Sequence, residues 1–276
     1  MDLTRTIWDG EDYVPSVWEG WFADPYGLLA VVEFGGKVVG LGKLTRLSPM
    51  DWWMEGLRVH PEFERRGIAS HLHDYLLDYW LRNGTGVIRL VTASFRLPIH
   101  RICERTGFQK VGEFTPFVAP TIDPNSEGID RDKFTSLVES QVDEGTRFVL
   151  SSPSMALSAG VMDLGWQWVT PSPERIRLAC HNQQAFWWMN RRGMLVILED
   201  NERSLRTSFL QLLACQIEDM VEILEGYRRL AGKLGFYQAG WVAPLHPEVE
   251  LRLNQVGFQR DWDASLYLFE KHHPES

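Results

Sequence analysis

The chain has 276 residues, 44% of them hydrophobic, which suits a globular protein of one large domain or, as we expect, two smaller ones. A formal net charge of −9 excludes the broad basic face that general affinity for nucleic acid or an anionic membrane would need. The three cysteines, Cys103, Cys180 and Cys215, lack metal-ligand spacing, so we expect thiols in a reducing compartment and no metal site. The start lacks the order of a signal peptide and no apolar run approaches the ~18 residues of a membrane span, so we expect a cytoplasmic protein.

The first elements expected along the chain are a helical segment and three strands. Residues 8–25 mix acids with aromatic side chains and contain two prolines, which predicts a short, loop-rich helical segment. Its aromatic side chains either form the wall of a pocket or pack on a sheet. Apolar runs on both sides of Gly35-Gly36 predict a β-hairpin, and a third strand follows at Gly56–Val59.

The charged turn Glu64-Arg65-Arg66-Gly67-Ile68-Ala69 follows this strand and precedes an amphipathic helix. A helix start leaves about four backbone N–H groups without intrahelical partners and carries about half a positive charge, so a phosphate can bind there. Gly67 permits close approach of an anion, Ala69 keeps the first turn small, and the two arginines add positive charge. Because Arg-Arg-Gly also occurs in ordinary loops, the turn alone is weak evidence for an anion site.

The helix after this turn has a core face at Ile68, Leu72, Leu76 and Tyr79, with His73 on another face. The remaining elements of the first half are a strand at 87–92, a helix at 98–105 and a last strand that begins at Phe108. The order is therefore helical segment, three strands, helix, strand, helix, strand, which is an α/β arrangement.

Residues 115–130 replace apolar periodicity with proline, serine, glycine and acids, which predicts a linker. We therefore expect one domain at 1–120 and a second at 121–276. The second half repeats the element order of the first, and Leu72 and Tyr75 recur as Leu224 and Tyr227 at an offset of 152, which indicates an internal duplication.

The second copy differs at the loop before its long helix. At the same offset, the turn reads Gln216-Ile217-Glu218-Asp219-Met220-Val221, which contains two acids, no arginine and no glycine. An anion would meet like charge there, so we expect this copy not to bind phosphate. Both acids also suit an ordinary helix start.

The hairpin, the strand that ends in Val59-His60-Pro61, the charged turn and Gly107-Phe108 together resemble the GCN5-related N-acetyltransferase (GNAT) superfamily. The family pattern is Gln/Arg-x-x-Gly-x-Gly/Ala after a strand ending in Val-x-Pro, and Glu64 departs from its first position. The resemblance covers the first half, and the rest only as a degenerate second copy. It implies tandem GNAT-like domains, each a mixed twisted sheet flanked by helices.

The resemblance implies acetyl-CoA as the cofactor. Its pyrophosphate would be held by backbone N–H groups of the charged turn and the first helical turn, and its pantetheine would pair with the third strand like an additional strand. The positions of this chain that correspond are Arg65, Arg66, Gly67, Ile68, Ala69 and Ser70 for the pyrophosphate and Leu57, Arg58 and Val59 for the pantetheine.

Attack of an amine on a thioester needs a base, and Glu55 is the candidate. Strand alternation predicts that it shares a face with Leu57 and Val59, where family members commonly carry an acidic base. The alternative is a strand-end carboxylate that faces water or pairs with an arginine. Cys103 stands where the family often has a general-acid tyrosine, and a small buried thiol that fills helix packing is the alternative to an acid role. Arg96 replaces the usual asparagine at the start of that helix.

Three segments, Asp12–Pro15, Trp21–Pro25 and Glu55–Val59, are similar to the histidine N-acetyltransferase group, which acetylates the α-amine of a free amino acid. This similarity implies that Tyr13, Trp18 and Trp21 border a pocket for a small amine.

The leading hypothesis is an N-acetyltransferase that acts on the primary amine of a small metabolite such as a free amino acid. A non-catalytic acyl-CoA sensor or interaction protein is the second, favoured by the missing tyrosine and the silent second copy. A protein or peptide N-acetyltransferase is the third, and it would need an open groove. We expect a small-molecule amine partner and neither nucleic acid nor membrane, and the sequence leaves a homodimer open.

Overall fold

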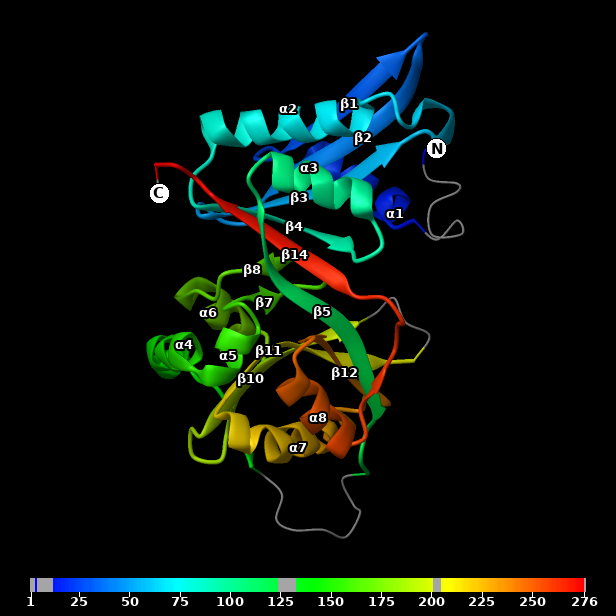
Figure 1. The fold of residues 1–276 in the computed structure, drawn as a ribbon. Helices are drawn as coiled ribbons and strands as arrows, with labels where there is room; N and C mark the ends of the chain where they lie inside the picture. Colours follow the sequence, from blue (N-terminus) through cyan, green and yellow to red (C-terminus); the bar gives the residue numbers. More distant parts are fainter. Residues whose placement is uncertain (1–2, 4–11, 124–132, 201–204, 276) are drawn as a thin grey trace. The chain divides into compact units, whose positions relative to one another are not determined.

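The computed structural model describes residues 3, 12–123, 133–200 and 205–275. The chain divides into two compact units, each a mixed sheet with helices packed on it (Figure 1). The first unit comprises 1–110 and 268–276, and the second unit comprises 111–267. This division differs from the expected one at residue 120, because the C-terminal segment belongs with the first unit.

The first unit has helices and strands in the predicted order, except that the last predicted strand belongs to the second unit and a C-terminal strand is added. Its elements are α1 (Val14–Ala23), β1 (Leu28–Phe34), β2 (Lys37–Arg46), β3 (Asp51–Val59), the 3-10 turn η2 (Pro61–Phe63), α2 (Ile68–Asn83), β4 (Val87–Ala93), α3 (Leu97–Arg105) and the end of β14 (Leu266–His272). The strand order is β1-β2-β3-β4-β14, with β1, β2 and β3 antiparallel in turn and β3 parallel to β4.

Helix α2 packs closely on β2 because two glycines of that strand carry no side chain. A Cβ on Gly40 would lie 2.8 Å from Cγ2 of Ile68, and one on Gly42 would lie 3.0 Å from Cδ1 of Leu76. The predicted core face of α2 is therefore confirmed. The expectation that His73 faces away from the core is wrong: its side chain is 1% exposed and its Nε2 hydrogen-bonds with Oγ1 of Thr106 at 2.9 Å. The segment after α3 covers that side of the helix.

Helix α1 packs on the other face of the same sheet. Val14 and Trp21 of this helix form a buried cluster with Leu3 and with Leu41 of β2, whose side chain points away from α2. The short helical segment predicted before the first strand is confirmed for residues 14–23, and residues 8–11 of that prediction lie outside the described part of the chain.

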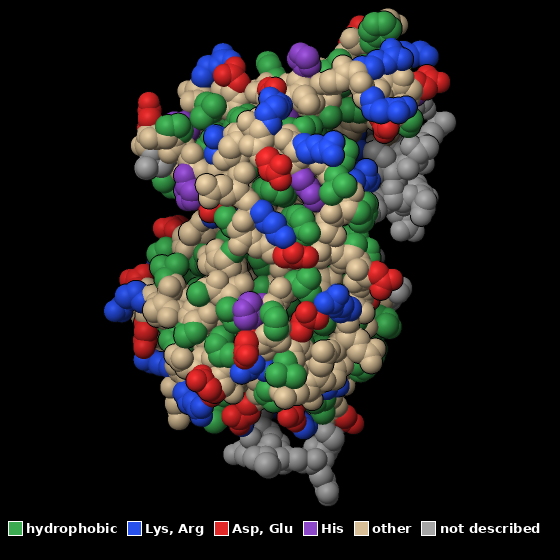
Figure 2. Space-filling model, viewed as in Figure 1, with side chains coloured by type: hydrophobic (Ala, Val, Ile, Leu, Met, Phe, Trp, Pro, Cys, Tyr) green, Lys and Arg blue, Asp and Glu red, His purple; other side chains and the backbone are tan. Residues whose placement is uncertain are grey.

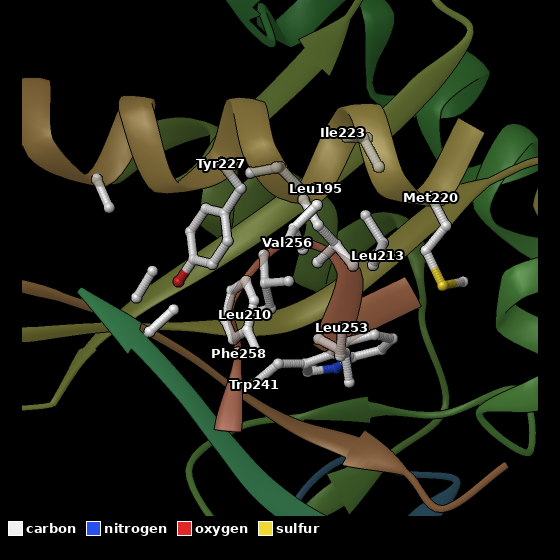
Figure 3. Close-up of a cluster of buried hydrophobic side chains, with 14 of the residues drawn as sticks. Leu195, Leu210, Leu213, Met220, Ile223, Tyr227, Trp241, Leu253, Val256 and Phe258 are labelled. Atoms are coloured by element: carbon white, nitrogen blue, oxygen red, sulfur yellow. The ribbon is translucent and has the colours of Figure 1, made fainter. Parts of the chain in front are cut away.

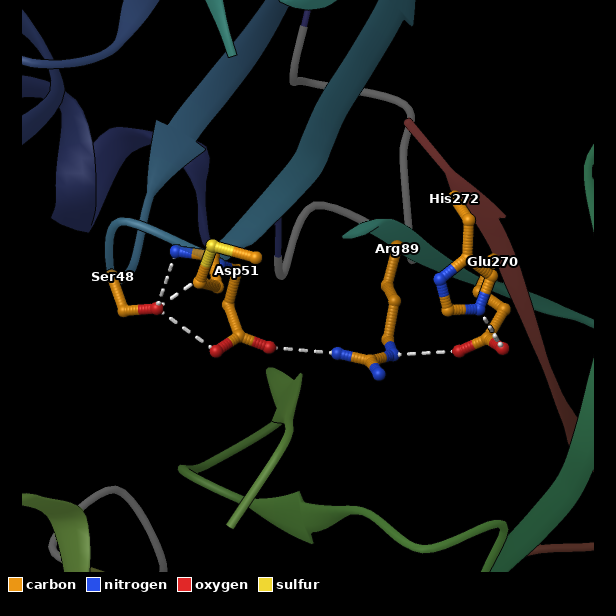
Figure 4. Close-up of polar contacts among 6 residues, drawn as sticks. Ser48, Asp51, Arg89, Glu270 and His272 are labelled. Carbon is orange, nitrogen blue, oxygen red and sulfur yellow. Dashed lines mark hydrogen bonds and ion pairs between the residues drawn. The ribbon is translucent and has the colours of Figure 1, made fainter. Parts of the chain in front are cut away.

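The C-terminal segment is held to the first unit by buried charges (Figure 4). The guanidinium of Arg89 on β4 donates through Nη1 to Oδ1 of Asp51 at 2.9 Å and through Nε to Oε2 of Glu270 at 3.0 Å. Arg89 and Asp51 are each 5% exposed. A buried arginine needs such partners, because its charge would otherwise be uncompensated. Removing one partner of a buried ion pair typically lowers the free energy of unfolding by about 3–5 kcal/mol.

The second unit is larger and begins with a strand of the first half. Its strands are β5 (Gln109–Pro120), β6 (Phe134–Ser136), β7 (Met162–Asp163), β8 (Trp168–Val169), β9 (Ala185–Trp188), β10 (Gly193–Asp200), β11 (Thr207–Cys215), β12 (Gln238–Pro244) and β13 (Gln259–Arg260). Its helical elements are η3 (Glu139–Gln141), α4 (Val142–Ser151), α5 (Pro153–Leu157), α6 (Pro173–His181), η4 (Ile217–Asp219), α7 (Met220–Lys233) and α8 (Pro247–Gln255). The main sheet has the order β5-β12-β11-β10-β9-β6, and β7 and β8 form a separate hairpin.

Strand β5 corrects the predicted linker. Residues 115–120 were expected to be irregular because of their prolines, but they pair with β12, as Pro116 does with Val242. Proline is compatible with a strand where its missing N–H is not needed, and here its carbonyl accepts a hydrogen bond from the N–H of Asp261 at 2.9 Å. Phe117, in the same segment, is 1% exposed. Residues 124–130 of the predicted linker lie outside the described part of the chain.

The core of the second unit lies between α7, α8 and the main sheet (Figure 3). Tyr227 of α7 is fully buried, and its hydroxyl donates to the carbonyl oxygen of Ser208 at 2.7 Å. The order β10-β11-α7-β12-α8 repeats the order β2-β3-α2-β4-α3, and β11 and β12 are parallel like β3 and β4. Both units therefore have GNAT-like topology, although Tyr75 is 57% exposed where the second copy has buried Tyr227.

Candidate active site

The start of α2 has the features of an anion site. Gly67 precedes the helix with φ of 83°, a left-handed conformation that glycine adopts without steric cost. No side chain caps this end of the helix, and its first turn contains no acid. The first helical hydrogen bond runs from the N–H of His71 to the carbonyl of Gly67 at 3.0 Å. The N–H groups of residues 68–70 therefore precede the helical hydrogen bonds and have the orientation that binds an anion.

The two arginines lie on the surface of the turn before this helix. Nη2 of Arg66 donates to the carbonyl of Glu62 at 3.0 Å, and its guanidinium lies 4.9 Å from the ring centroid of Phe63. Arg65 has φ of 60°, an uncommon conformation for a residue with a side chain. The structure thus brings the six predicted pyrophosphate-binding residues together in one turn and one helix start.

Strands β3 and β4 separate where the pantetheine is expected. Their parallel pairing runs from Asp51 opposite Val87 to Trp53 opposite Arg89, and within the described residues it stops there. Strand β3 nevertheless continues to Val59 and β4 to Ala93. The backbone edge of 57–59 that faces β4 is therefore not used in that pairing, and an extended ligand could pair with it.

A β-bulge in β3 determines which side chains face the acceptor side. This is the face of the sheet that carries α1, where the acceptor amine is expected to bind. Lys43 of β2 lies opposite Glu55, but Leu41 lies opposite Arg58, so β3 has one residue more than β2 between these pairs. The additional residue follows from Gly56, which has φ of 66°. Without the bulge, Glu55 and Arg58 would point to opposite faces of the sheet.

The bulge makes the alternation argument for Glu55 wrong. The side chain of Leu57 points to the α2 face, where its Cδ1 would be 3.7 Å from a Cβ on Gly42. Glu55 lies opposite Lys43, the neighbour of Gly42 in β2, and so points to the α1 face. The residue remains a candidate, but on the face that carries the aromatic segment.

Five residues around this bulge, which we call the bulge cluster, come together from the chain before α1 and from β3: Asp12, Tyr13, Glu55, Gly56 and Arg58. The carboxylate of Asp12 accepts two hydrogen bonds from Arg58, from Nε at 2.9 Å and from Nη2 at 2.8 Å. The guanidinium also lies 5.5 Å from the ring centroid of Tyr13. This bidentate pair fixes the entrance to α1 against the bulge.

Tyr13 connects the cluster to the aromatic segment. Burial of its hydroxyl end and the nearby charge of Glu55 raise the pKa of Tyr13 above its usual range, while Arg58 acts in the opposite direction. The residue as a whole is still 40% exposed, so part of Tyr13 reaches solvent. Its ring contacts Trp21 edge to face, with centroids 6.0 Å apart.

The two predicted tryptophans have different positions. Trp21 is 8% exposed and covers Gly56, where an added Cβ would be only 2.2 Å from its Cη2 atom. Trp18 is half-buried and packs against the same hydrophobic cluster. Tyr13 is thus the predicted substrate residue that lies beside Glu55, and its ring contacts the buried ring of Trp21.

The carboxylate of Glu55 is held in place by a neighbouring strand. Oγ1 of Thr45 donates to Oε1 of Glu55 at 2.6 Å, and the side chain of Glu55 is half-buried. Thr45 and Asp12 are residues of the site to which the sequence interpretation gave no role. Asp12 lies directly before Tyr13 in the segment Asp12–Pro15, but its partner Arg58 is 46 residues away in the sequence. No local pattern could therefore indicate this pair.

Cys103 lies in the core of the first unit. Its side chain is 0% exposed, and burial raises the pKa of its thiol to about 12. A group without exposed surface does not reach a substrate, so the structure favours the packing role over proton donation. Arg96 lies exposed at the start of α3.

The corresponding helix start in the second unit is acidic. Residues 217–219 form η4, and α7 has Glu222 in its first turn. The carboxylate of Asp219 is buried and forms an ion pair with Arg192. A pyrophosphate at this helix would meet these acids, whereas the first turn of α2 has none.

On the face drawn in Figure 2, basic and acidic side chains are interspersed. Within the described residues, no helix is long and apolar enough to cross a membrane. The same part of the chain contains no group of three or more His, Cys, Asp or Glu side chains that could hold a metal ion.

Comparison with known families gives one match, in the first half of the chain. Residues 2–108 match the profile of the acetyltransferase (GNAT) family. A search of the curated proteins finds no match.

Several solved structures share the fold over nearly the whole chain. A GCN5-related N-acetyltransferase from Sphaerobacter thermophilus has a TM-score of 0.59 at 10% identity, over 95% of this chain and 86% of its own. A protein from Thermoplasma acidophilum, described as a candidate acetyltransferase, has a TM-score of 0.56 at 15% identity, over 95% and 84%. A GCN5-related glucosamine N-acetyltransferase region in a fungal multi-domain β-N-acetylglucosaminidase has a TM-score of 0.64 at 14% identity, over 97% of this chain and 36% of that protein.

Residues 2–108 are therefore similar to the GNAT family, and the solved structures show that the chain shares their fold. Members of this family in general use acetyl-CoA.

Proposed function

We propose that the first unit transfers an acetyl group from acetyl-CoA to the primary amine of a small metabolite, with a free amino acid as the acceptor class. The observation that carries this proposal is the bulge cluster, which lies where β3 leaves β4 and joins Glu55 to an aromatic wall. The second unit is, in this proposal, a degenerate GNAT-like domain without a cofactor site.

The start of α2 fits acetyl-CoA. Gly67 leaves the backbone open, the N–H groups of residues 68–70 precede the helical hydrogen bonds, and Arg65 and Arg66 add positive charge. The edge of β3 at 57–59 is the partner that the pantetheine amides would use. When bound, acetyl-CoA supplies the activated acetyl group.

Glu55 is the residue that takes the proton of the attacking amine in this proposal. Its carboxylate accepts a hydrogen bond from Thr45 and lies near Tyr13. A positioned carboxylate of this kind typically contributes about 10²–10⁴-fold to the rate. Cys103 has no part in the proposal, because its thiol has no exposed surface.

The chemistry of the acceptor side supports a small amine. Tyr13 supplies an aromatic surface, and the aromatic segment covers the sheet face from which a protein substrate would approach. The similarity of Asp12–Pro15 and Glu55–Val59 to the histidine N-acetyltransferase group supports a free amino acid among such amines.

The test is a screen for CoA release with a thiol reagent, over free amino acids, polyamines, aminoglycosides and short peptides. We expect turnover with at least one small amine and a loss of kcat of at least about 100-fold in Glu55→Gln. Acetyl-CoA affinity should stay within twofold in that variant. Glu33→Gln, an exposed acid on β1, is the matched control and should keep full activity.

Two results would contradict the proposal. Tight acetyl-CoA binding without turnover over the whole panel would support an acyl-CoA sensor instead. Turnover that survives Glu55→Gln within about threefold would remove Glu55 from the role of base.

A further inference from the structure

The second unit contains a cavity of about 280 Å³. Its walls come from the turn between β7 and β8, from the ends of β10 and β12, and from the middle of β11. The lining residues are Asp163, Gly165, Trp166, Leu198, Glu199, Asp200, Phe209, Leu210, Gln211 and Val242.

The second-unit cavity lies at a β-bulge that corresponds to the bulge of β3. Ile197 pairs with Leu210 and Val196 pairs with Leu212, so Gln211 is the additional residue of β11. The parallel pairing of β11 with β12 ends at Leu210 opposite Trp241, as the pairing of β3 with β4 ends just before its own bulge.

The cavity also occupies the corresponding face of the sheet. Ile197 and Leu210 belong to the core against α7, so the next pair, Leu198 and Phe209, points to the opposite face and lines the cavity. In the first unit, the bulge cluster lies on the face opposite α2. The second unit has thus lost the phosphate-binding turn but has kept a hollow where the first unit has its acceptor side.

The chemistry of the lining is anionic and aromatic. Its charged residues are Asp163, Glu199 and Asp200, and among the described residues that line it none is basic. Glu199 is paired with Arg206, from whose Nε it accepts a hydrogen bond at 2.6 Å. Phe209 and Trp166 supply aromatic surface.

Asp163 is the buried acid of this lining. It is 9% exposed, and Oδ1 accepts a hydrogen bond from the N–H of Gly165 at 2.9 Å. Burial raises its pKa to about 7, opposed by backbone N–H groups of the turn and by no basic side chain. The ionised form of this buried carboxylate is stabilised by backbone amides alone. A bound cation would stabilise it further, because an opposite charge nearby favours the ionised form.

Trp166 stands at the same turn in a strained conformation. Its φ is 65°, a left-handed value that costs a residue with a side chain about 1–2 kcal/mol, and its side chain is 44% exposed. Strained residues of this kind concentrate at ligand sites.

We propose that the second-unit cavity binds a small organic cation, an amine whose ammonium group pairs with Asp163 and whose apolar part contacts Trp166 and Phe209. The aromatic surfaces stabilise such a cation further. The volume lies just below the range of about 300–1,000 Å³ for ligand pockets in general, which suits a small ligand. Because the adjacent helix start is acidic, this site binds without acetyl transfer, and the chain carries a second amine site in addition to that of the first unit.

The test is calorimetric titration of the full-length Glu55→Gln protein with phenethylamine, with 2-phenylethanol as the uncharged analogue of the same shape. The background variant weakens the acceptor site of the first unit, so the remaining binding reports on the second unit. We expect one phenethylamine per chain and at least tenfold weaker binding of 2-phenylethanol. Asp163→Asn should weaken phenethylamine binding at least tenfold while it keeps the hydrogen bond from Gly165.

A second variant protects the test against misfolding. Trp166→Gly removes the aromatic wall and relieves the left-handed strain, so the protein should stay folded and lose phenethylamine binding at least tenfold. Failure of phenethylamine to bind at millimolar concentration, equal binding of the alcohol, or binding unchanged in both variants would each overturn the proposal.

Discussion

Gly56→Ala is the substitution that tests the bulge cluster most sharply. An alanine at this position would have to keep φ of 66°, which costs about 1–2 kcal/mol for any residue with a Cβ. The Cβ would also be 2.2 Å from Cη2 and 2.7 Å from Cζ3 of Trp21, far inside contact distance. Trp21 is 8% exposed and must therefore move within a packed region, for which overpacking costs about 1–3 kcal/mol.

Gly36→Ala is the matched control. Gly36 has φ of 77° in the turn between β1 and β2, and a Cβ there would have no heavy atom within 4 Å. It therefore shares the backbone strain of Gly56→Ala without the collision. We expect a loss of about 1–2 kcal/mol in the control and about 2–5 kcal/mol in Gly56→Ala.

The assay is urea unfolding together with initial rates for the best amine of the screen. Displacement of Trp21 shifts the ring of Tyr13 that it contacts, so KM for the amine should rise at least fivefold in Gly56→Ala, with acetyl-CoA affinity unchanged. The control should keep the wild-type KM. Equal unfolding free energies for the two variants, or equal KM values, would refute the packing argument for this site.

Two further predictions concern stability. Burial lowers the pKa of His73 from 6.5 to about 4, so the stability that its neutral form contributes is complete above pH 6.5 and is lost as pH falls toward 4. The loss is about 3 kcal/mol, and His73→Gln should show a flatter dependence of unfolding free energy on pH between 7 and 4, whereas parallel curves would contradict the assignment. Glu270→Ala removes one partner of buried Arg89 and should cost up to about 3 kcal/mol. Glu225→Ala, which breaks an exposed pair on α7, should cost less than about 0.5 kcal/mol, and similar losses in the two variants would contradict the role of the C-terminal strand.

Much of the fold was accessible from local patterns. The two-glycine turn, the core face of α2 and the strand–turn–helix order around Gly67 each depend on residues close in sequence, and the structure confirms them. The acidic helix start of the second unit was also predictable, because Glu218 and Asp219 stand at the offset positions of Arg66 and Gly67.

The wrong predictions concern residues whose conformation depends on distant segments of the chain or on a single backbone irregularity. Residues 115–120 look like a linker, and only pairing with β12 makes them a strand. Periodicity assigns Glu55 to one face of β3, but the positive φ of Gly56 reverses that assignment. The pair of Asp12 with Arg58 leaves no local pattern in the sequence. The acceptor side could therefore be identified only from the structure, whereas the start of α2 could be predicted from the sequence.

The proposed function requires that acetyl-CoA binds at the start of α2 and nowhere else in the chain. The direct measurement is calorimetric titration of the full chain with acetyl-CoA, for wild type, Gly67→Asn and Gly67→Asp. The two side chains have the same shape and the same backbone strain, and a Cβ at this position meets no atom closer than 3.7 Å, so they differ in charge alone.

Wild type should bind one acetyl-CoA per chain. Two charges about 4 Å apart interact by about 1 kcal/mol in water and about 4 kcal/mol near a protein surface. Gly67→Asp should therefore bind acetyl-CoA at least tenfold more weakly than Gly67→Asn. Equal affinities for these two variants, or two molecules bound per chain, would contradict the central claim.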